Sequence, residues 1–192
     1  MWKYEKKLQF PVNIKKKNIQ MAKYIITQVG GPNGELAATL RYLNQRYTMP
    51  DEKGKAILSD IATEEMAHME IVSAMIYQLL EGATVEELKE AGLSSHYTEH
   101  GYGIYPNDAN GVPFTATFFA VTGDPLADLA EDMAAEQKAR ATYENLMNLT
   151  DDEDILAPLS FLRQREIIHY ERFKALYEEY ADKLLGDKSY LI

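Results

Sequence analysis

Apolar side chains recur every three or four residues along most of this chain, which is the spacing of amphipathic α-helices. Glycines and prolines interrupt the pattern, most clearly at 30–34 and in the segment 92–113. Between the interruptions the pattern predicts four long helices, the first of them broken at its glycines. Their expected ranges are about 18–48, 51–81, 125–149 and 152–185.

Several of the expected helices begin at good capping residues. Asp51 is a typical N-cap, and Asp124 stands before Pro125, a residue that favours the first helical position. Asp152 is placed to begin the last helix, and Thr84 opens a capping box for a short additional helix. These signals fix where the helices begin more firmly than where they end.

The segments outside the long helices are an arm and a connection. Residues 1–17 predict an extended N-terminal arm, and residues 82–124 form a long connection. Within it, the β-prone stretch 114–121 is expected to be a short strand. We therefore expect a single domain, 1–192, of the all-α class, folded as a four-helix bundle.

The chain also contains an internal repeat. A shift of 101 residues aligns 35–70 with 136–171 without a gap. Twelve of the 36 aligned positions are identical, whereas average compositions would match at roughly one position in fifteen to twenty. The repeat predicts two related helix pairs and a pseudo-twofold axis through the bundle.

Some of the repeated residues are polar but occupy apolar positions. Glu65 and His68 lie on the apolar stripe of the second long helix, and Glu166 and His169 lie on that of the fourth. Glu136 falls on the stripe of the third. A buried carboxylate is very costly unless it is paired or binds a metal.

Two Glu-x-x-His pairs, each 30 residues after another repeated glutamate, are typical of a dinuclear metal site in a helical bundle. The candidate ligands are Glu35, Glu65, His68, Glu136, Glu166 and His169. Carboxylates with imidazole and no sulfur suit iron or manganese better than copper or zinc. The alternative is a set of solvated, salt-bridged helix faces. His96 and His100 lie outside the repeat and are expected at the surface.

Composition narrows the function further. The chain has 20 Lys+Arg against 30 Asp+Glu, a formal net charge of −10, which argues against a nucleic-acid or anionic-membrane partner. The absence of cysteine excludes disulfides and thiolate catalysis. No run approaches the roughly 18 apolar residues of a membrane span, and no apolar segment of a secretory signal follows the N-terminal lysines. We expect a protein made in the cytoplasm, without a membrane span.

Six motifs carry a family resemblance over nearly the whole chain. They are GELAATLRYL (34–43), TEEMAHME (63–70), GVPFT (111–115), GDPLADL (123–129), AEQKARA (135–141) and REIIH (165–169). At these motifs the chain resembles the manganese catalases of the ferritin-like superfamily. The opening MWKYEKKLQ is similar to the spore-coat members of that family. The resemblance implies a ferritin-like bundle.

The resemblance also implies how the metals are held. Glu35 and His68 would bind one ion, Glu136 and His169 would bind the other, and Glu65 would bridge them. The implied cofactor is two manganese ions per chain, although iron fits the same donors.

Other residues match family positions close to the metals. Glu166 matches a glutamate that moves protons without binding metal, and it is the expected catalytic residue. Tyr42 matches a tyrosine near the first metal-binding glutamate. Some members have an arginine where this chain has Ala135, so we expect more open access to the metals. The C-terminal extension of the larger catalases is missing after about residue 185.

The implied activity is conversion of two molecules of hydrogen peroxide into two of water and one of oxygen. The resemblance also implies a homo-oligomer, a hexamer in the family, located in the spore coat with other coat proteins as partners. Two alternatives stay open. One is a di-iron ferroxidase or oxidase, in which Glu166 would be a ligand. The other is a structural spore-coat protein with an inactive metal site.

Overall fold

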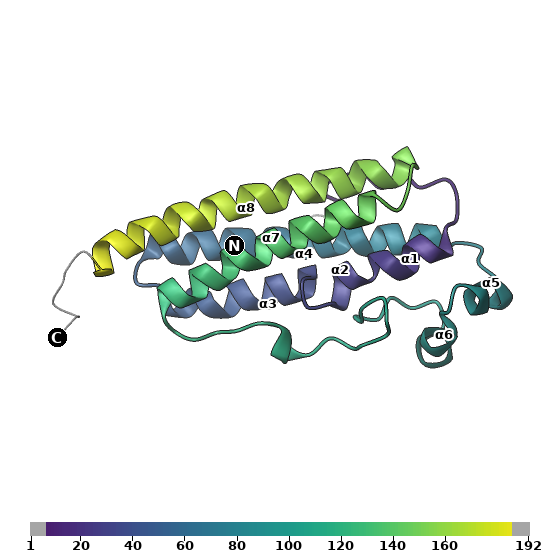
Figure 1. Ribbon diagram of the computed structural model, residues 1–192, viewed down its shortest axis with the longest axis horizontal. Helices are drawn as coiled ribbons and strands as arrows, with labels where there is room; N and C mark the ends of the chain where they lie inside the picture. The colour runs from purple at the N-terminus through teal and green to yellow at the C-terminus, as the bar shows by residue number, and fades with distance from the viewer. Residues whose placement is uncertain (1–6, 186–192) are drawn as a thin grey trace.

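The computed structural model describes residues 7–185, and within this range the chain forms helices and no β-strand (Figure 1). The first six residues of the predicted arm lie outside the described part. The α-helices are α1 (Ile19–Ile25), α2 (Thr27–Gly30), α3 (Glu35–Gln45), α4 (Glu52–Leu80), α5 (Val85–Glu90), α6 (Ser94–His100), α7 (Pro125–Met147) and α8 (Glu153–Leu185). Two 3₁₀ turns are η1 (Arg46–Thr48) and η2 (Ala116–Phe118).

The predicted four-helix bundle is confirmed. Helices α3, α4, α7 and α8 lie side by side, with α1 and α2 continuing the line of α3 (Figure 1). Helix α3 packs mainly on α4, and α7 packs mainly on α8. These two helix pairs are the two halves of the sequence repeat.

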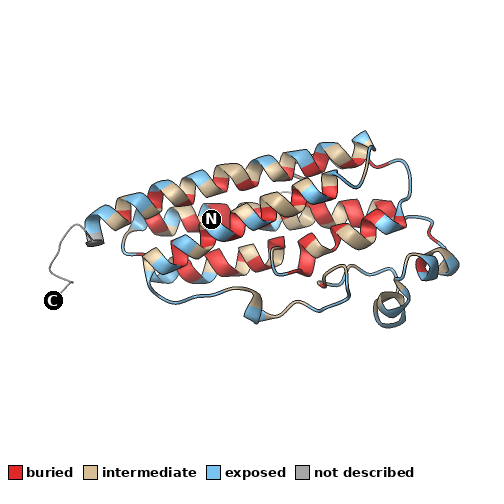
Figure 2. Cartoon of the chain, viewed as in Figure 1, coloured by how far each residue is buried: buried red, intermediate tan, exposed pale blue. Residues whose placement is uncertain are grey.

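The two largest apolar clusters of the core lie on either side of a buried polar layer, and a third, smaller one contains Ile19, Ala83 and Leu88. On α4, one cluster contains Leu58 and Ile61, and the other begins at Ile71. Glu65 and His68 lie between them and are fully buried. Buried positions therefore run along the inward faces of all four long helices, while the connection before α7 is largely exposed (Figure 2).

The expected caps are present. The Asp51 carboxylate accepts from the Gly54 amide, and the Asp124 carboxylate accepts from the two amides that follow Pro125. Thr84 and Glu87 form the predicted capping box of α5. These side chains satisfy amide groups that would otherwise lack partners at the helix starts.

The glycines that break the first helix permit a close chain crossing. A Cβ at Gly30 would lie 2.1 Å from the carbonyl carbon of Pro106, so only glycine allows this contact. The chain turns at Gly31, whose backbone is extended, and α3 begins at Glu35. The break therefore sets the position of Glu35 at the first turn of a new helix.

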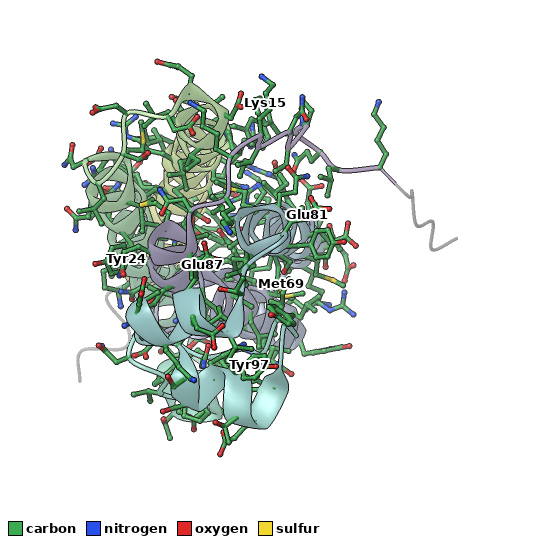
Figure 3. The ribbon with its side chains drawn as sticks, turned by 90° about the vertical axis from the view of Figure 1, so that its right-hand side faces the viewer. Lys15, Tyr24, Met69, Glu81, Glu87 and Tyr97 are labelled. Carbon is green, nitrogen blue, oxygen red and sulfur yellow. The ribbon has the colours of Figure 1, made fainter. Side chains whose placement is uncertain are left out.

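The arm packs along the bundle. Gln78 of α4 accepts from the Ile14 amide at 2.7 Å and donates to the Val12 carbonyl at 3.0 Å. The Phe10 ring stacks on Phe161 of α8 with centroids 4.8 Å apart. In the end view of Figure 3, Lys15 of the arm lies at the upper edge and Tyr97 of α6 lies at the lower edge.

The prediction of a strand at 114–121 is wrong. The segment contains only the turn η2, and no neighbouring strand lies beside it among residues 7–185. Its carbonyl groups are instead bound by side chains of α3: Arg41 donates to the Phe118 carbonyl and Gln45 to the Ala120 carbonyl, both at 3.1 Å. β-Propensity alone could not reveal that these partners are side chains.

The connection also contains a helix, α6, that the sequence pattern did not predict. His96 and His100 lie on it and are partly buried rather than fully exposed. His96 Nε2 lies 2.8 Å from the Gly103 carbonyl oxygen, and the His100 ring stacks on Tyr105 with centroids 3.9 Å apart. These contacts hold the connection together. None of the described helices is both long and apolar enough to cross a membrane.

We predict that Asp51→Ala lowers the free energy of unfolding by about 1–2 kcal/mol, because it removes the cap of α4. The same carboxylate accepts from the Tyr180 hydroxyl of α8 at 2.6 Å. Tyr180→Phe keeps the cap and removes only this hydrogen bond, so its loss should be smaller, about 0.5–1.5 kcal/mol. Urea denaturation followed by circular dichroism measures both. Equal stability of Asp51→Ala and the unchanged protein would contradict this role.

Candidate metal centre

All six candidate ligands predicted from the repeat meet in the buried polar layer. Their ligand atoms form two groups, and within each group all the atoms lie within 4.8 Å of one another. One group is Glu35, Glu65, His68 and Glu166; the other is Glu65, Glu136, Glu166 and His169. Every member is at most 2 % exposed. Solvated helix faces, the alternative explanation, are thereby excluded.

The four long helices each contribute to the cluster. Glu35 is the first residue of α3 and Glu136 lies in the middle of α7. Helices α4 and α8 each present a glutamate and a histidine one turn apart. The His68 and His169 rings are nearly parallel, at 19° with centroids 5.6 Å apart, as expected for residues related by a pseudo-twofold axis.

Glu65 lies between the two histidines. Its Oε2 is 2.8 Å from Nδ1 of His68, and its Oε1 is 2.7 Å from Nδ1 of His169. His68 Nδ1 is also 3.9 Å from Glu35 and 3.8 Å from Glu166, and His169 Nδ1 is 3.6 Å from Glu136. Both rings therefore direct Nδ1 at the carboxylates.

Two buried tyrosines connect the halves of the repeat. Tyr42 of α3 donates its hydroxyl proton to Glu136 of α7, and Tyr143 of α7 donates to Glu35 of α3. Tyr42 therefore bonds the glutamate of the opposite half, whereas the resemblance had implied a position near Glu35. The repeat pairs Tyr42 with Tyr143, and this pairing is the sequence signal for the second tyrosine.

Glu64 is a site residue that sequence reasoning missed. Its Oε2 lies 3.0 Å from Nε2 of His169, and its Oε1 lies 3.7 Å from Nε2 of His68. Arg165 donates to Oε2 at 3.0 Å, and Gln9 donates to Oε1 at 2.7 Å. Glu64 is thus within hydrogen-bond distance of the outer nitrogen of His169 and within ion-pair distance of that of His68, and both rings direct Nδ1 inward.

The repeat did contain a signal for Glu64. The shift of 101 residues pairs Glu64 with Arg165, a mismatch of opposite charges. The structure shows that these two side chains form an ion pair, with Nε of the arginine 2.7 Å from Oε1. Residues related by a pseudo-twofold axis can lie close together near that axis. The opposite charges of Glu64 and Arg165 at one repeated position therefore indicated a contact between them.

Burial and mutual repulsion hold protons on part of the cluster. Burial, followed by the charge of Glu65, raises the pKa of Glu35 well above its usual value. Burial also raises the pKa of Glu166, and the neighbouring charges of Glu65 and Glu136 raise it further. Without a metal, burial and the neighbouring charges therefore favour the protonated form of these two carboxyls.

Glu65 and the two histidines shift one another's pKa values. Burial alone would raise the pKa of Glu65, but His169 and His68 outweigh it and lower that pKa. Burial alone would lower the pKa of each histidine, but Glu65 outweighs it and raises the pKa of His68 to about 9 and that of His169 to about 12. The cluster without metal is thus a network of shared protons.

Several atoms of the cluster have no hydrogen-bond partner. They include Glu136 Oε2 and Glu166 Oε1, both buried. Glu65 Oε1 and His169 Nδ1 lie 2.7 Å apart as an ion pair but do not form a hydrogen bond with each other or with another group. Unsatisfied buried donors and acceptors are rare in native proteins and call for an ion or another partner. The donor set of carboxylate oxygens and imidazole Nδ1 fits a pair of manganese or iron ions.

A small cavity adjoins the cluster. Its walls include Glu35, Glu136, Glu166 and Tyr42, together with Ala135. The space that the centre of a water-sized molecule can occupy is about 10 Å³, enough for about one water. Only molecules of about this size fit beside the carboxylates.

Comparisons with known proteins identify relatives of this chain. The sequence model described as manganese containing catalase matches residues 1–185. The chain is 54 % identical to Protein CotJC of Bacillus subtilis over 178 residues, which cover 93 % of this chain and 94 % of CotJC. It is 36 % identical to a probable manganese catalase of Clostridium acetobutylicum over 192 residues, which cover 98 % of this chain and 83 % of that protein.

A solved structure supports the same relationship. The crystal structure of KatB, a manganese catalase from Anabaena PCC7120, superposes with a TM-score of 0.86 at 32 % identity. The match covers 94 % of this chain and 81 % of KatB.

We predict that Glu64→Ala weakens metal binding roughly 10–100-fold, because the histidine rings lose the acceptor that orients them. Gln9→Ala is the matched control, since it removes a hydrogen bond to Glu64 and leaves both histidine contacts. Competition with a chelating dye measures the affinities. An unchanged affinity in Glu64→Ala would remove this residue from the site.

Proposed function

We propose that this chain, which belongs to the manganese-containing catalase family, converts hydrogen peroxide into water and oxygen at a pair of manganese ions. The observation that carries the proposal is the pair of overlapping ligand groups. They share Glu65 and Glu166, so two ions could be held side by side in one dry cavity.

The donors divide naturally between two ions. Glu35 with His68 would hold one, and Glu136 with His169 would hold the other. Glu65 would bridge them, since one of its oxygens faces each histidine. The hydroxyl donors Tyr42 and Tyr143 and the acceptor Glu64 would keep these ligands in position.

A manganese pair, when bound, supplies two electrons to one peroxide molecule and takes two from another. In a full cycle two protons pass from the second peroxide to the first. Glu166 is the buried carboxyl that can hold one of them, because burial and its acidic neighbours favour its protonated form. It also lines the cavity by which peroxide would reach the cluster.

The size of the cavity favours a small substrate. It has room for about one water-sized molecule at the carboxylates. Organic substrates of ordinary size would not fit without displacement of its walls. A small, uncharged molecule such as hydrogen peroxide can enter an acidic cavity without repulsion.

One feature also favours a second candidate, a di-iron ferroxidase or oxidase. Glu166 belongs to both groups of candidate ligands, so it could bind metal instead of carrying protons. The two candidates differ in which metal is bound and in whether Glu166 is a ligand.

We further propose a location in the spore coat as a homo-oligomer, a hexamer by family resemblance. The support is the resemblance to spore-coat members of the family, and the 54 % identity to Protein CotJC is consistent with it. Other coat proteins would then be its partners, and a structural coat protein with an inactive metal site is the outcome to be excluded.

Metal analysis and oxygen release, measured on one sample, test the catalase proposal. Protein from manganese-supplemented cells should contain about two manganese ions per chain and release oxygen from hydrogen peroxide. Two irons with oxidation of Fe(II) and no oxygen release would favour the ferroxidase. Absence of stoichiometric metal after growth with either metal would favour the structural coat protein.

We predict that Glu166→Gln lowers the rate of oxygen release roughly 10²–10⁴-fold, because the amide cannot take up and give back a proton. Both metals should remain bound, since Glu166 is not among the ligands in the catalase assignment. Glu171→Gln is the matched control, because it removes an exposed carboxylate from the same helix. Loss of metal in Glu166→Gln would instead support the ferroxidase assignment.

A further inference from the structure

The cavity above the candidate metal centre is lined by four small residues and by longer polar side chains, among them the carboxylates of the cluster. Gly34 and Ala38 lie on the α3 side, and Ala135 and Ala139 lie on the α7 side. The cavity has room for about one water-sized molecule, so the longer side chains in its walls limit the space beside these small residues.

Arg41 is the one cationic side chain among the residues that line this cavity. It is 1 % exposed and is among the largest fully buried side chains of the described residues. It lines the cavity beside Tyr42, whose hydroxyl bonds Glu136. The arginine therefore lies within one residue of the site on α3, and it was not among the residues singled out from the sequence.

Arg41 is held from two directions. Its Nε donates to Oε1 of Glu131 on α7 at 3.1 Å, and its Nη2 donates to the Phe118 carbonyl at 3.1 Å. The first bond spans the two helices that form the cavity walls. The second attaches the segment before α7 to α3. Burial alone would lower the pKa of Arg41, but Tyr42 and Glu131 outweigh it, so the guanidinium stays charged.

Gln45, one turn further along α3, makes a parallel contact. It donates to the Ala120 carbonyl at 3.1 Å and lies 3.4 Å from Oε2 of Glu131. Gln45 is buried but does not line the cavity. Both residues bond Glu131 and a carbonyl of the segment before α7, and only Arg41 also lines the cavity.

We propose that Arg41 closes the passage between α3 and α7 and so determines which molecules can reach the acidic cluster. The Arg41 side chain lines the cavity together with the alanines, and its two hydrogen bonds, to partners outside the cavity lining, fix its position. Water and hydrogen peroxide fit past it, whereas larger molecules, including metal chelators, do not. The claim that hydrogen peroxide is the molecule admitted rests on the proposed function, whereas the claim that Arg41 closes the passage does not.

The absence of cysteine from the chain permits a direct test that needs no metal or activity. Ala139→Cys places one thiol in the cavity wall, where the native alanine is 8 % exposed. Its rate of alkylation is measured with iodoacetamide and with the bulkier N-ethylmaleimide, with and without Arg41→Ala. We expect Arg41→Ala to raise the rate at least about tenfold, and more for the bulkier reagent.

Three controls separate closure from general loosening. Gln45→Ala removes the parallel contact and should leave the rate at Ala139→Cys nearly unchanged. Ala62→Cys reports on the core, because Ala62 is fully buried on α4 and does not line the cavity. Arg41→Met, which keeps an unbranched side chain but loses both hydrogen bonds, serves if Arg41→Ala does not fold, and it should raise the rate less.

Equal alkylation rates with and without Arg41 would overturn the proposal. So would an equal increase at Ala62→Cys, because the whole bundle would then be opening. Removal of metal by EDTA gives a second measurement, expected to be faster in Arg41→Ala. If alkylation is faster but the protein holds no metal, the closure stands and the proposed function fails.

Discussion

The costly burial of four carboxylates and two imidazoles in an apolar bundle is the constraint on which the rest of this structure depends. Glu65 and His68 interrupt the core of α4, and Glu166 and His169 interrupt that of α8. The apolar clusters on either side exclude water and strengthen every charge interaction between them. Hydrogen bonds within the cluster satisfy only part of it, and several buried atoms still lack partners. The proposed metal pair would account for such a layer.

The pseudo-twofold relation explains how a small chain builds this layer. Each half supplies a helix pair with the same polar positions, and the supporting contacts cross from one half to the other. Tyr42 bonds Glu136, Tyr143 bonds Glu35, and Glu64 pairs with Arg165. The two halves therefore fix each other's ligands. The halves also differ at Glu64. Glu64 lies next to both histidines, whereas Arg165, its counterpart in the repeat, neutralises the charge of Glu64.

The sequence predicted what depends on local rules and on the repeat. Helix starts at Asp51 and Asp124 follow from capping. Five of the six cluster residues follow from polar identities at apolar positions, and Glu35 follows from the repeat. The sequence did not predict contacts between residues that are distant along the chain. The segment 114–121 looked like a strand because its partners, Arg41 and Gln45, are side chains distant in sequence. The bundle class and the family were both recoverable, whereas the closure by Arg41 required three-dimensional contacts.

The most direct test of the account is a crystal of the manganese-loaded protein measured at the manganese absorption edge. The account predicts two anomalous peaks in the buried layer, one next to Glu35 and His68 and the other next to Glu136 and His169, with Glu65 reaching both. No peak in this layer, or a peak only at the protein surface, would contradict the claim that the buried carboxylates are there to hold a metal pair.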